Sequence, residues 1–326
     1  MSRMNDQLKT AVLFLVFNRL DTTKQVFETI RQAKPPRLYV AADGPRASRP
    51  DDVEKVRNVR DYIMGNIDWK CDVKTLFRSE NLGCKMAVSS AITWFFEHEE
   101  MGIILEDDCL PDQSFYSFCE KMLEAYKNEN TIGMIAGMNY LFNRVKMSES
   151  YFFSRYYPIW GWATWRRAWK LYNINISKWQ SPEMEKQLKT IYKDGNVVRF
   201  FKQMFENVAS AKIDTWDIQW VYTCIFHNLQ CIAPKYNLVS NIGFVGTHTS
   251  TKRSKFFNMP VKSIDINNIH YPKNIVSSNK IDRIMFNSII GPFWYPKQLI
   301  KTLYRYLVKV PLLCNICKRI KKYFIA

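Results

Sequence analysis

The chain has 326 residues, 47% hydrophobic and 15% aromatic, with only 11 glycines. This composition excludes a disordered chain and supplies enough apolar surface for a buried core. Lysine and arginine outnumber aspartate and glutamate by 47 to 30, and the charge of +17 favours an anionic partner. Much of that excess falls in residues 297–326, and no helix-turn-helix, zinc-finger or RNP signature is present, so a nucleic-acid groove is disfavoured.

The sequence carries no signature of secretion or of a membrane span. Its first apolar run, Ala11–Phe17, follows a polar start and ends in Asn18-Arg19 without a cleavage-like site. No apolar run reaches the ~18 residues that a spanning helix needs. The 8 cysteines are typical of reduced thiols, and Cys314 and Cys317 lack the further ligands of a zinc site. These features predict a cytoplasmic protein.

The first half alternates strand and helix patterns. The continuous apolar run at 11–17 predicts a strand buried on both faces, and further strands are predicted at 38–42, near 73–77, at 102–105 and at 131–137. Helical spacing predicts helices at about 21–33, 51–64 and 82–96, and a fourth that starts at Pro111-Asp112. We expect Asp21 to cap the first helix. This succession predicts an α/β fold: an open, mostly parallel sheet with helices on both faces.

The second half is less regular. It contains an aromatic-rich segment at 151–172, helices within 182–210 and 215–228, and short strands up to Val245. We expect one catalytic domain over 1–294, with a nucleotide half at about 9–140 and an acceptor half at about 141–260. Basic residues recur every fourth position at the start of the tail, 295–326: Lys297, Lys301, Arg305 and Lys309. Apolar residues fill the other face, which predicts amphipathic helices on an anionic membrane surface, the alternative being a helix docked on the domain.

Ligands of open parallel sheets bind at the carboxyl ends of the strands. One such end carries Glu106-Asp107-Asp108, three carboxylates that repel one another and favour a hard cation such as Mg²⁺ or Mn²⁺. Strand alternation places Glu106 and Asp108 on one side and Asp107 on the other. The alternative is an acidic strand end held by arginine or lysine.

Two other strand ends and one helix start supply weaker candidates. Asn18 and Arg19 follow the first strand, and Arg19 is suited to a phosphate. Asp43, after the second strand, is suited to the ring NH of a uracil, or is simply a turn residue before Gly44. Lys85 lies in the first turn of a predicted helix, where it either reaches the same phosphates or is solvated.

The second half supplies the remaining candidates. His248 ends an apolar strand pattern and is suited to a metal ion or a phosphate oxygen, although a lone histidine is more often structural. Asp217 and Asp214 open a helix-like segment; either is a candidate general base, and capping is the ordinary role of one of them. Trp160, Gly161 and Trp162 form an aromatic stretch in which one or two rings are candidates for a sugar-stacking wall.

The order of these motifs resembles the GT-A glycosyltransferases over about Val12–His248. It is most similar to the group of the N-acetylglucosaminyltransferase that initiates complex N-glycans, with its bacterial relatives. The resemblance implies a Rossmann-like GT-A fold, a UDP-sugar donor and a Mn²⁺ or Mg²⁺ cofactor. It also implies that Asp108 binds the metal, Asp43 binds uracil and Asp217 is the base. The first strand departs from that group, because Asn18 stands where the eukaryotic enzyme has an acidic residue before the arginine.

The membrane anchor of the Golgi enzymes has no counterpart, which favours a bacterial enzyme at the inner face of the plasma membrane. Its acceptor would be a glycan or a lipid-linked envelope precursor, and transfer would be a single displacement with inversion. One alternative is a sugar-1-phosphate nucleotidylyltransferase, which usually has a glycine-rich phosphate loop after the first strand, where this chain has Asn18-Arg19-Leu20-Asp21. The other is a non-catalytic nucleotide-sugar-binding protein of the same fold.

Overall fold

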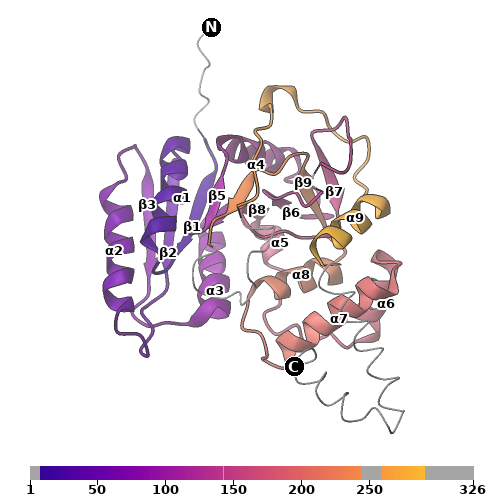
Figure 1. The fold of residues 1–326 in the computed structure, drawn as a ribbon, viewed down its shortest axis with the longest axis horizontal. Coiled ribbons are helices and arrows are strands. Elements are labelled where there is room, and N and C mark those ends of the chain that lie inside the picture. The colour runs from indigo at the N-terminus through magenta and orange to yellow at the C-terminus, as the bar shows by residue number, and fades with distance from the viewer. Residues whose placement is uncertain (1–7, 142, 244–257, 291–326) are drawn as a thin grey trace, which may run out of the picture.

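In the computed structural model, which describes residues 8–141, 143–243 and 258–290, one eight-stranded sheet runs through both halves of the chain (Figure 1). The strands follow the order β3-β2-β1-β4-β8-β6-β9-β7. Their bounds are β1 Ala11–Val16, β2 Arg37–Ala42, β3 Asp72–Phe77, β4 Met101–Glu106, β6 Ile132–Ala136, β7 Tyr151–Ser154, β8 Trp162–Trp165 and β9 Gln230–Pro234. A separate antiparallel pair joins β5 (Cys109–Pro111) to β10 (Val239–Asn241).

The sheet is mixed but mostly parallel. Strands β3, β2, β1 and β4 are parallel neighbours, as are β6 and β9. Strand β8 lies antiparallel between β4 and β6, and β7 closes the far edge antiparallel to β9. The chain leaves β1 toward β2 and later returns on the opposite side of β1 as β4, so a topological switch point lies between β1 and β4. Ligand sites of open α/β sheets lie at such points.

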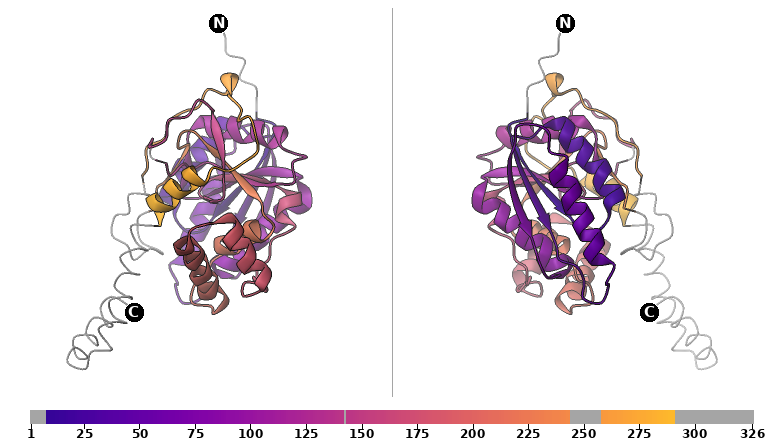
Figure 2. Two further views of the ribbon diagram at one scale, coloured as in Figure 1. Left: turned by 90° about the vertical axis from the view of Figure 1, so that its right-hand side faces the viewer. Right: turned by 90° about the vertical axis from the view of Figure 1, so that its left-hand side faces the viewer.

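Side chains of the central strands alternate between two hydrophobic layers. In β1, Val12, Phe14 and Val16 face one layer, whereas Leu13 and Leu15 face the other. The first layer is covered by α1 (Leu20–Ala33), α2 (Asp52–Gly65) and α4 (Gln113–Ala125), and Figure 2 shows α1 beside α2. The second is covered by α3 (Gly83–His98), α5 (Arg166–Trp169), α7 (Gly195–Ala209) and α8 (Asp217–Phe226). Burial on both faces explains why these strands are continuous apolar runs.

The helices of the second half gather below their strands in Figure 1, with α6 (Pro182–Ile191) beside α7 and α8. Four tryptophans join α8 and α5 to the sheet: Trp162, Trp169, Trp216 and Trp220. After η1 (Ile266–Asn268), the helix α9 (Asn279–Ile289) returns to the edge of the sheet. There the Ser154 hydroxyl on β7 donates to Asp282 on α9 at 2.6 Å.

The first half of the chain follows the predicted succession, with two differences. The first helix begins at Leu20, so Asp21 lies inside the first turn and does not cap the helix; the position before the helix belongs to Arg19, whose side chain makes no capping hydrogen bond. The short strand β5 was not expected, because its three residues carry no periodic pattern. None of the helices in the described ranges is long and apolar enough to cross a membrane. Val245, His248, Cys314, Cys317 and the basic tail at 295–326 lie outside the described residues.

Candidate functional site

The carboxyl ends of β1, β2 and β4 meet at the switch point and bring most of the sequence candidates together. Strand β1 is followed by Asn18 and Arg19, β2 by Asp43, and β4 ends at Glu106. The two short strands β5 and β10 lie beside them, since β5 directly follows the acidic stretch. The sheet therefore positions a polar cluster at the edge where α/β proteins bind ligands.

Arg19 holds the acidic stretch in place. Its guanidinium forms an ion pair with Asp107 through one terminal nitrogen, and Nε donates to Asp107 Oδ2 at 3.4 Å. The same terminal nitrogen lies 3.0 Å from Asp108 Oδ2. Because β4 ends at Glu106, Asp107 and Asp108 lie in a turn and both reach Arg19. The expected alternation, which separated Asp107 from Asp108, stops where the strand stops.

Glu106 has no partner of this kind. Among the described residues, no side chain or backbone group donates a hydrogen bond to its carboxylate and no cation pairs with it. Burial raises the pKa of Glu106 well above its usual range, and the charges of Asp108 and Asp107 raise it further. The charge of Asp217 acts in the same direction, so this carboxylate and Glu106 repel each other. Glu106 is thus an acid that gains from an added cation.

Gly243 covers the turn from the side of β10. A Cβ atom at this position would lie 2.2 Å from Asp108 Oδ2 and 2.8 Å from an Arg19 nitrogen. The backbone is fixed there, because Ile242 N donates to the Asp108 carbonyl at 2.8 Å and Gly243 N to the Asn241 side chain at 3.0 Å. Only glycine leaves room for the ion pair below it.

Asp43 anchors the start of α3. Oδ1 accepts the backbone N–H groups of Gly44 and Leu82, each at 3.0 Å. Oδ2 accepts the Asn81 amide at 2.9 Å and the Gly83 N–H at 3.2 Å. These bonds satisfy donors at the helix N-terminus. Asp43 therefore has a structural partner for each oxygen, and contact with a uracil stays a prediction.

The loops around Asp43 depend on two residues that the sequence patterns did not single out. Asp52 is fully buried and accepts hydrogen bonds from the Asn18 amide at 2.7 Å and from Arg46 Nη2 at 2.9 Å. Hydrogen bonds from Arg46 and then from Asn18 lower the pKa of Asp52 to about 2, against its burial. Asn18 therefore braces the loop after β2.

Arg60, on α2, is the second of these residues. One terminal nitrogen donates to the carbonyls of Arg78 at 2.7 Å, Asp43 at 3.1 Å and Ala42 at 3.3 Å. Its guanidinium also lies 5.0 Å from the centre of the Phe77 ring. Arg60 thus clamps the ends of β2 and β3 together. An arginine on a helix is usually solvated, so no pattern in the sequence distinguishes Arg60 from an ordinary surface arginine.

Asp217 is the first residue of α8. Its Oδ1 accepts the Thr215 hydroxyl and the Ile218 N–H, the latter at 2.8 Å. No side chain of the described residues donates to Oδ2. Burial raises the pKa of Asp217. The Tyr172 hydroxyl donates to the Trp216 carbonyl at 3.0 Å and so fixes the residue before Asp217.

Asp214 is exposed and lies against the start of α3. A Cβ atom at Gly83, the first residue of α3, would lie 3.2 Å from Asp214 Oδ2. The thiol of Cys84 has its pKa raised to about 12, by burial first and then by the charges of Glu106, Asp217, Asp214 and Asp43. The charges of these four carboxylates, which come from three segments of the chain, therefore all act on one thiol at the start of α3.

The remaining candidates differ in position. Lys85 lies in the first turn of α3, partly exposed, and its ammonium has no partner among the described residues. Trp160 is partly exposed beside Gly161, whose φ of +65° and close approach to Val239 require glycine. Trp162 is 1% exposed and stacks on Trp216 with ring centres 5.7 Å apart. Its ring belongs to the core and presents no face to a sugar.

A divalent cation fits the chemistry of this turn. In the part of the chain that the structure describes, no three histidine, cysteine or acidic side chains are close enough to hold a metal ion by themselves. Among the described residues, Glu106 is nevertheless a carboxylate without a pairing cation beside Asp108, and such hard oxygen donors suit Mg²⁺ or Mn²⁺. Both ions are commonly held by one or two carboxylates together with substrate phosphates. His248, the other predicted metal ligand, lies outside the described residues.

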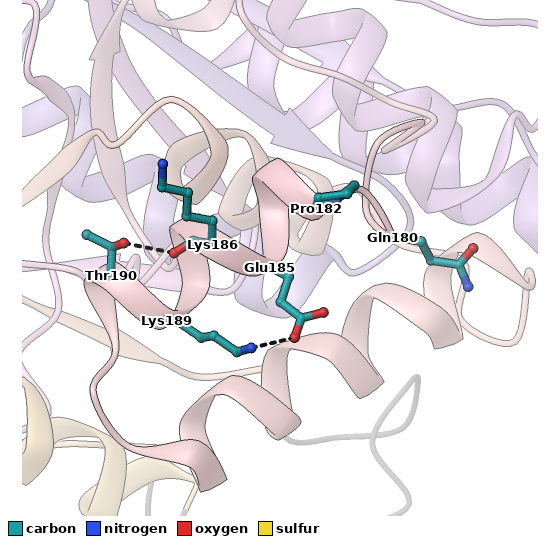
Figure 3. Close-up of a pocket in the computed structure, with 6 residues that line it drawn as sticks. All are labelled: Gln180, Pro182, Glu185, Lys186, Lys189 and Thr190. Atoms are coloured by element: carbon teal, nitrogen blue, oxygen red, sulfur yellow. Dashed lines mark hydrogen bonds and ion pairs between the residues drawn. The ribbon is translucent and has the colours of Figure 1, made fainter.

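A hollow of about 510 Å³ lies elsewhere, along α6 (Figure 3). Its described lining consists of Gln180, Pro182, Glu185, Lys186, Lys189 and Thr190. Hydrogen bonds from Lys189 and Lys202 lower the pKa of Glu185 to about 2. The acid of this hollow, Glu185, is thus already paired with lysines of α6 and α7. None of the described candidate residues lines the hollow. The hollow is therefore separate from the switch-point site.

Comparison with known proteins does not place the chain in a family. No family model matches it, and no curated protein sequence matches it. The solved structure of a galactosyltransferase, LgtC, in complex with donor and acceptor sugar analogues is 12% identical to this chain and has a TM-score of 0.32. The match covers 71% of this chain and 86% of the LgtC chain. An apo UDP-glucose pyrophosphorylase is 8% identical with a TM-score of 0.31, covering 69% and 93%. Scores this low assign no reaction, so function has to be argued from the site.

Proposed function

We propose that this protein is a metal-dependent glycosyltransferase of the GT-A type that takes its sugar from a nucleoside diphosphate donor, UDP being the proposed carrier. The proposal rests on two carboxylates whose charges interact: Glu106, which is suited to a cation, and Asp217, which is suited to the role of a base. Among the described residues Glu106 has no pairing cation beside the Arg19-bound turn, and its carboxylate interacts with the charge of Asp217 at the start of α8. The first supports cation and diphosphate binding, and the second is a base for an acceptor hydroxyl.

In the proposed reaction, Asp217 takes the proton of an acceptor hydroxyl through its free oxygen. The acceptor oxygen attacks the anomeric carbon from the side opposite the diphosphate, whose bond to the sugar breaks, so the configuration inverts. Lys85 and Arg19 are placed to receive the negative charge that develops on the diphosphate. A divalent cation held by Asp108 and Glu106 would stabilise the same charge. Trp160 is the remaining candidate for the acceptor side, and the proposed acceptor is a glycan or lipid-linked envelope precursor.

One observation favours transfer over nucleotidyl transfer. The segment between β1 and α1 is only Phe17, Asn18 and Arg19, and it contains no glycine. A nucleotidylyltransferase usually wraps a glycine-rich loop around the triphosphate at this place. Here Asn18 is bonded to Asp52 and Arg19 to the acidic turn. The short, braced connection therefore favours a diphosphate donor.

Calorimetry with UDP and Mn²⁺ tests the proposal. We expect the wild-type protein to bind UDP only with Mn²⁺, and Asp108→Ala to lose that binding while its melting temperature stays close to the wild-type value. Asp108 lies in a turn and fills no core volume, which is why the fold should survive. Asp68→Ala, which removes an exposed acid, should bind as the wild type does. Unchanged UDP affinity in Asp108→Ala would mean that the turn is only structural.

A further inference from the structure

The ion pair at the acidic turn is built unequally from its two carboxylates. Asp107 receives two groups of the Arg19 guanidinium, and its side chain is only 5% exposed. Asp108 receives one terminal nitrogen at 3.0 Å, and its side chain is 17% exposed. Asp107 is therefore the anchor of Arg19, and Asp108 is a second, weaker contact.

That second contact occupies the carboxylate assigned to the metal ion. A cation that approached Asp108 Oδ2 would meet the Arg19 guanidinium within ion-pair distance. The site is partly buried, since the Arg19 side chain is only 22% exposed, so solvent screens this repulsion weakly. Gly243 packs so closely on the pair that a single added carbon would lie 2.2 Å from Asp108 Oδ2 and 2.8 Å from an Arg19 nitrogen, so there is little room on this side. Without an anionic ligand, Arg19 and a free divalent cation therefore compete for Asp108.

A nucleoside diphosphate changes this balance. Its oxygens accept hydrogen bonds from a guanidinium as a carboxylate does, and they bind hard cations. With a diphosphate present, Arg19 has a new anionic partner while it stays anchored on Asp107. Asp108 is then free for the cation, and the repulsion between the two positive groups is offset by the phosphates between them.

We propose that Arg19 is a specificity-determining residue that makes the acidic turn accept the metal–nucleotide complex and reject the free divalent cation. The inference rests on the proposed function, because it takes the complex of a divalent cation with a nucleoside diphosphate as the ligand. The inference predicts two changes in affinity of opposite sign, which a merely structural role of Arg19 would not produce. Loss of Arg19 should strengthen the binding of the metal ion alone and weaken the binding of metal ion plus nucleotide.

The decisive variant is the double substitution Arg19→Gln with Asp107→Asn. Removing Arg19 alone would leave Asp107 buried without its partner and would endanger the fold. The double variant removes one positive and one negative charge, so the net charge of the turn is unchanged. Any gain in cation binding then comes from the release of Asp108. Asp107→Asn alone is the matched control, because it keeps Arg19 and leaves Asp108 as its only carboxylate.

Binding of Mn²⁺ without nucleotide is followed through the electron paramagnetic resonance signal of the free ion. We expect the double variant to bind Mn²⁺ at least about tenfold more tightly than the wild type, the size of one charge-assisted contact. Asp107→Asn should bind no more tightly than the wild type. Arg31→Gln, which removes an arginine paired on the surface with Asp68, should leave the affinity unchanged. Adding Asp108→Ala to the double variant should abolish the gain.

Binding of UDP with Mn²⁺ should fall about tenfold or more in the double variant, since the diphosphate loses a cationic partner. Equal or weaker binding of Mn²⁺ alone in a folded double variant would overturn the inference, as would tight nucleotide-free binding in the wild type. Failure of the wild type to bind UDP with Mn²⁺ would instead overturn the proposed function. The arms with Mn²⁺ alone do not depend on nucleotide, so the two failures are distinguishable.

Discussion

At the scale of single residues, hydrogen bonds hold one carboxylate oxygen of Asp217 and leave the other for the acceptor. Thr215 and the Ile218 N–H hold one carboxylate oxygen, while Tyr172 fixes the residue before it through the Trp216 carbonyl. Burial raises the pKa of Asp217, which makes its carboxylate a better proton acceptor than a solvated one. A base has to be held in this way while one oxygen stays available to the acceptor.

We therefore expect Asp217→Asn to cut sugar transfer by roughly 10²–10⁴-fold, because the amide cannot take the acceptor proton. UDP affinity should change little, since the base acts on the acceptor. Transfer kinetics and calorimetry measure the two effects, and product NMR reads the anomeric configuration, which should be inverted. Asp214→Asn is the matched control, three residues earlier and exposed. Normal transfer in Asp217→Asn with loss in Asp214→Asn would give the role of the base to Asp214.

At the scale of elements, α2 contributes to the candidate site although no candidate residue lies on it. Arg60 donates to three carbonyls at the ends of β2 and β3, one of them that of Asp43. Arg60→Met keeps the packing on Phe77 but removes these bonds, so we expect unfolding free energy to fall by about 1–3 kcal/mol. Amide exchange of Leu82 and Gly83 should speed up, because their acceptor is Asp43. Urea denaturation and hydrogen exchange measure both.

The control for this change is Arg57→Met, an exposed arginine one turn earlier on α2. It should leave stability and exchange at the wild-type level. If both variants behaved alike, the bonds of Arg60 would contribute nothing beyond those of an ordinary surface arginine.

The elements also show what a sequence pattern can predict. Apolar runs such as Ala11–Val16 predicted the parallel strands, because burial on both faces leaves no polar position. The strand ends then predicted which polar residues meet. The patterns did not predict β5, because it depends on where β4 ends. They offered an acidic strand end held by arginine or lysine as an alternative, but did not identify Arg19 as the residue that holds Asp107 and Asp108. Nor did they place Trp162, because its burial depends on β8 lying in the middle of the sheet.

At the scale of the whole molecule, Asp282 couples pH to stability. It lies on α9, is 7% exposed, and accepts the Ser154 hydroxyl of β7. Burial raises its pKa to about 6, although the hydrogen bonds from Ser154 and the Arg155 N–H lower it. The unfolded chain has a pKa of about 4 for this group. The folded state therefore holds a proton that the unfolded state releases between about pH 4 and pH 6.

This contribution to stability is complete below about pH 4 and is lost as the pH rises through 6. We expect it to reach about 2–3 kcal/mol. Asp282→Asn, which stays neutral, should lack this part of the pH dependence when unfolding free energies are measured by urea at several pH values. Asp61→Asn, at an exposed position of α2, should retain it. The same pH dependence in Asp282→Asn as in the wild type would contradict the assignment.

The position of β8 governs the order in which the chain folds as the ribosome releases it. Within the described part of the chain, the strands β1 to β4 pair with one another and, through β4, with β8. This part of the sheet is therefore complete once Glu106 has emerged, except for the outer edge of β4. Strand β6 is synthesised earlier than β8 but lies beyond it, and its other partner is β9. Until β8 arrives, the apolar edge of β4 stays unpaired, which exposes a nascent chain to aggregation. We expect the fold to depend on chaperones during that interval of synthesis.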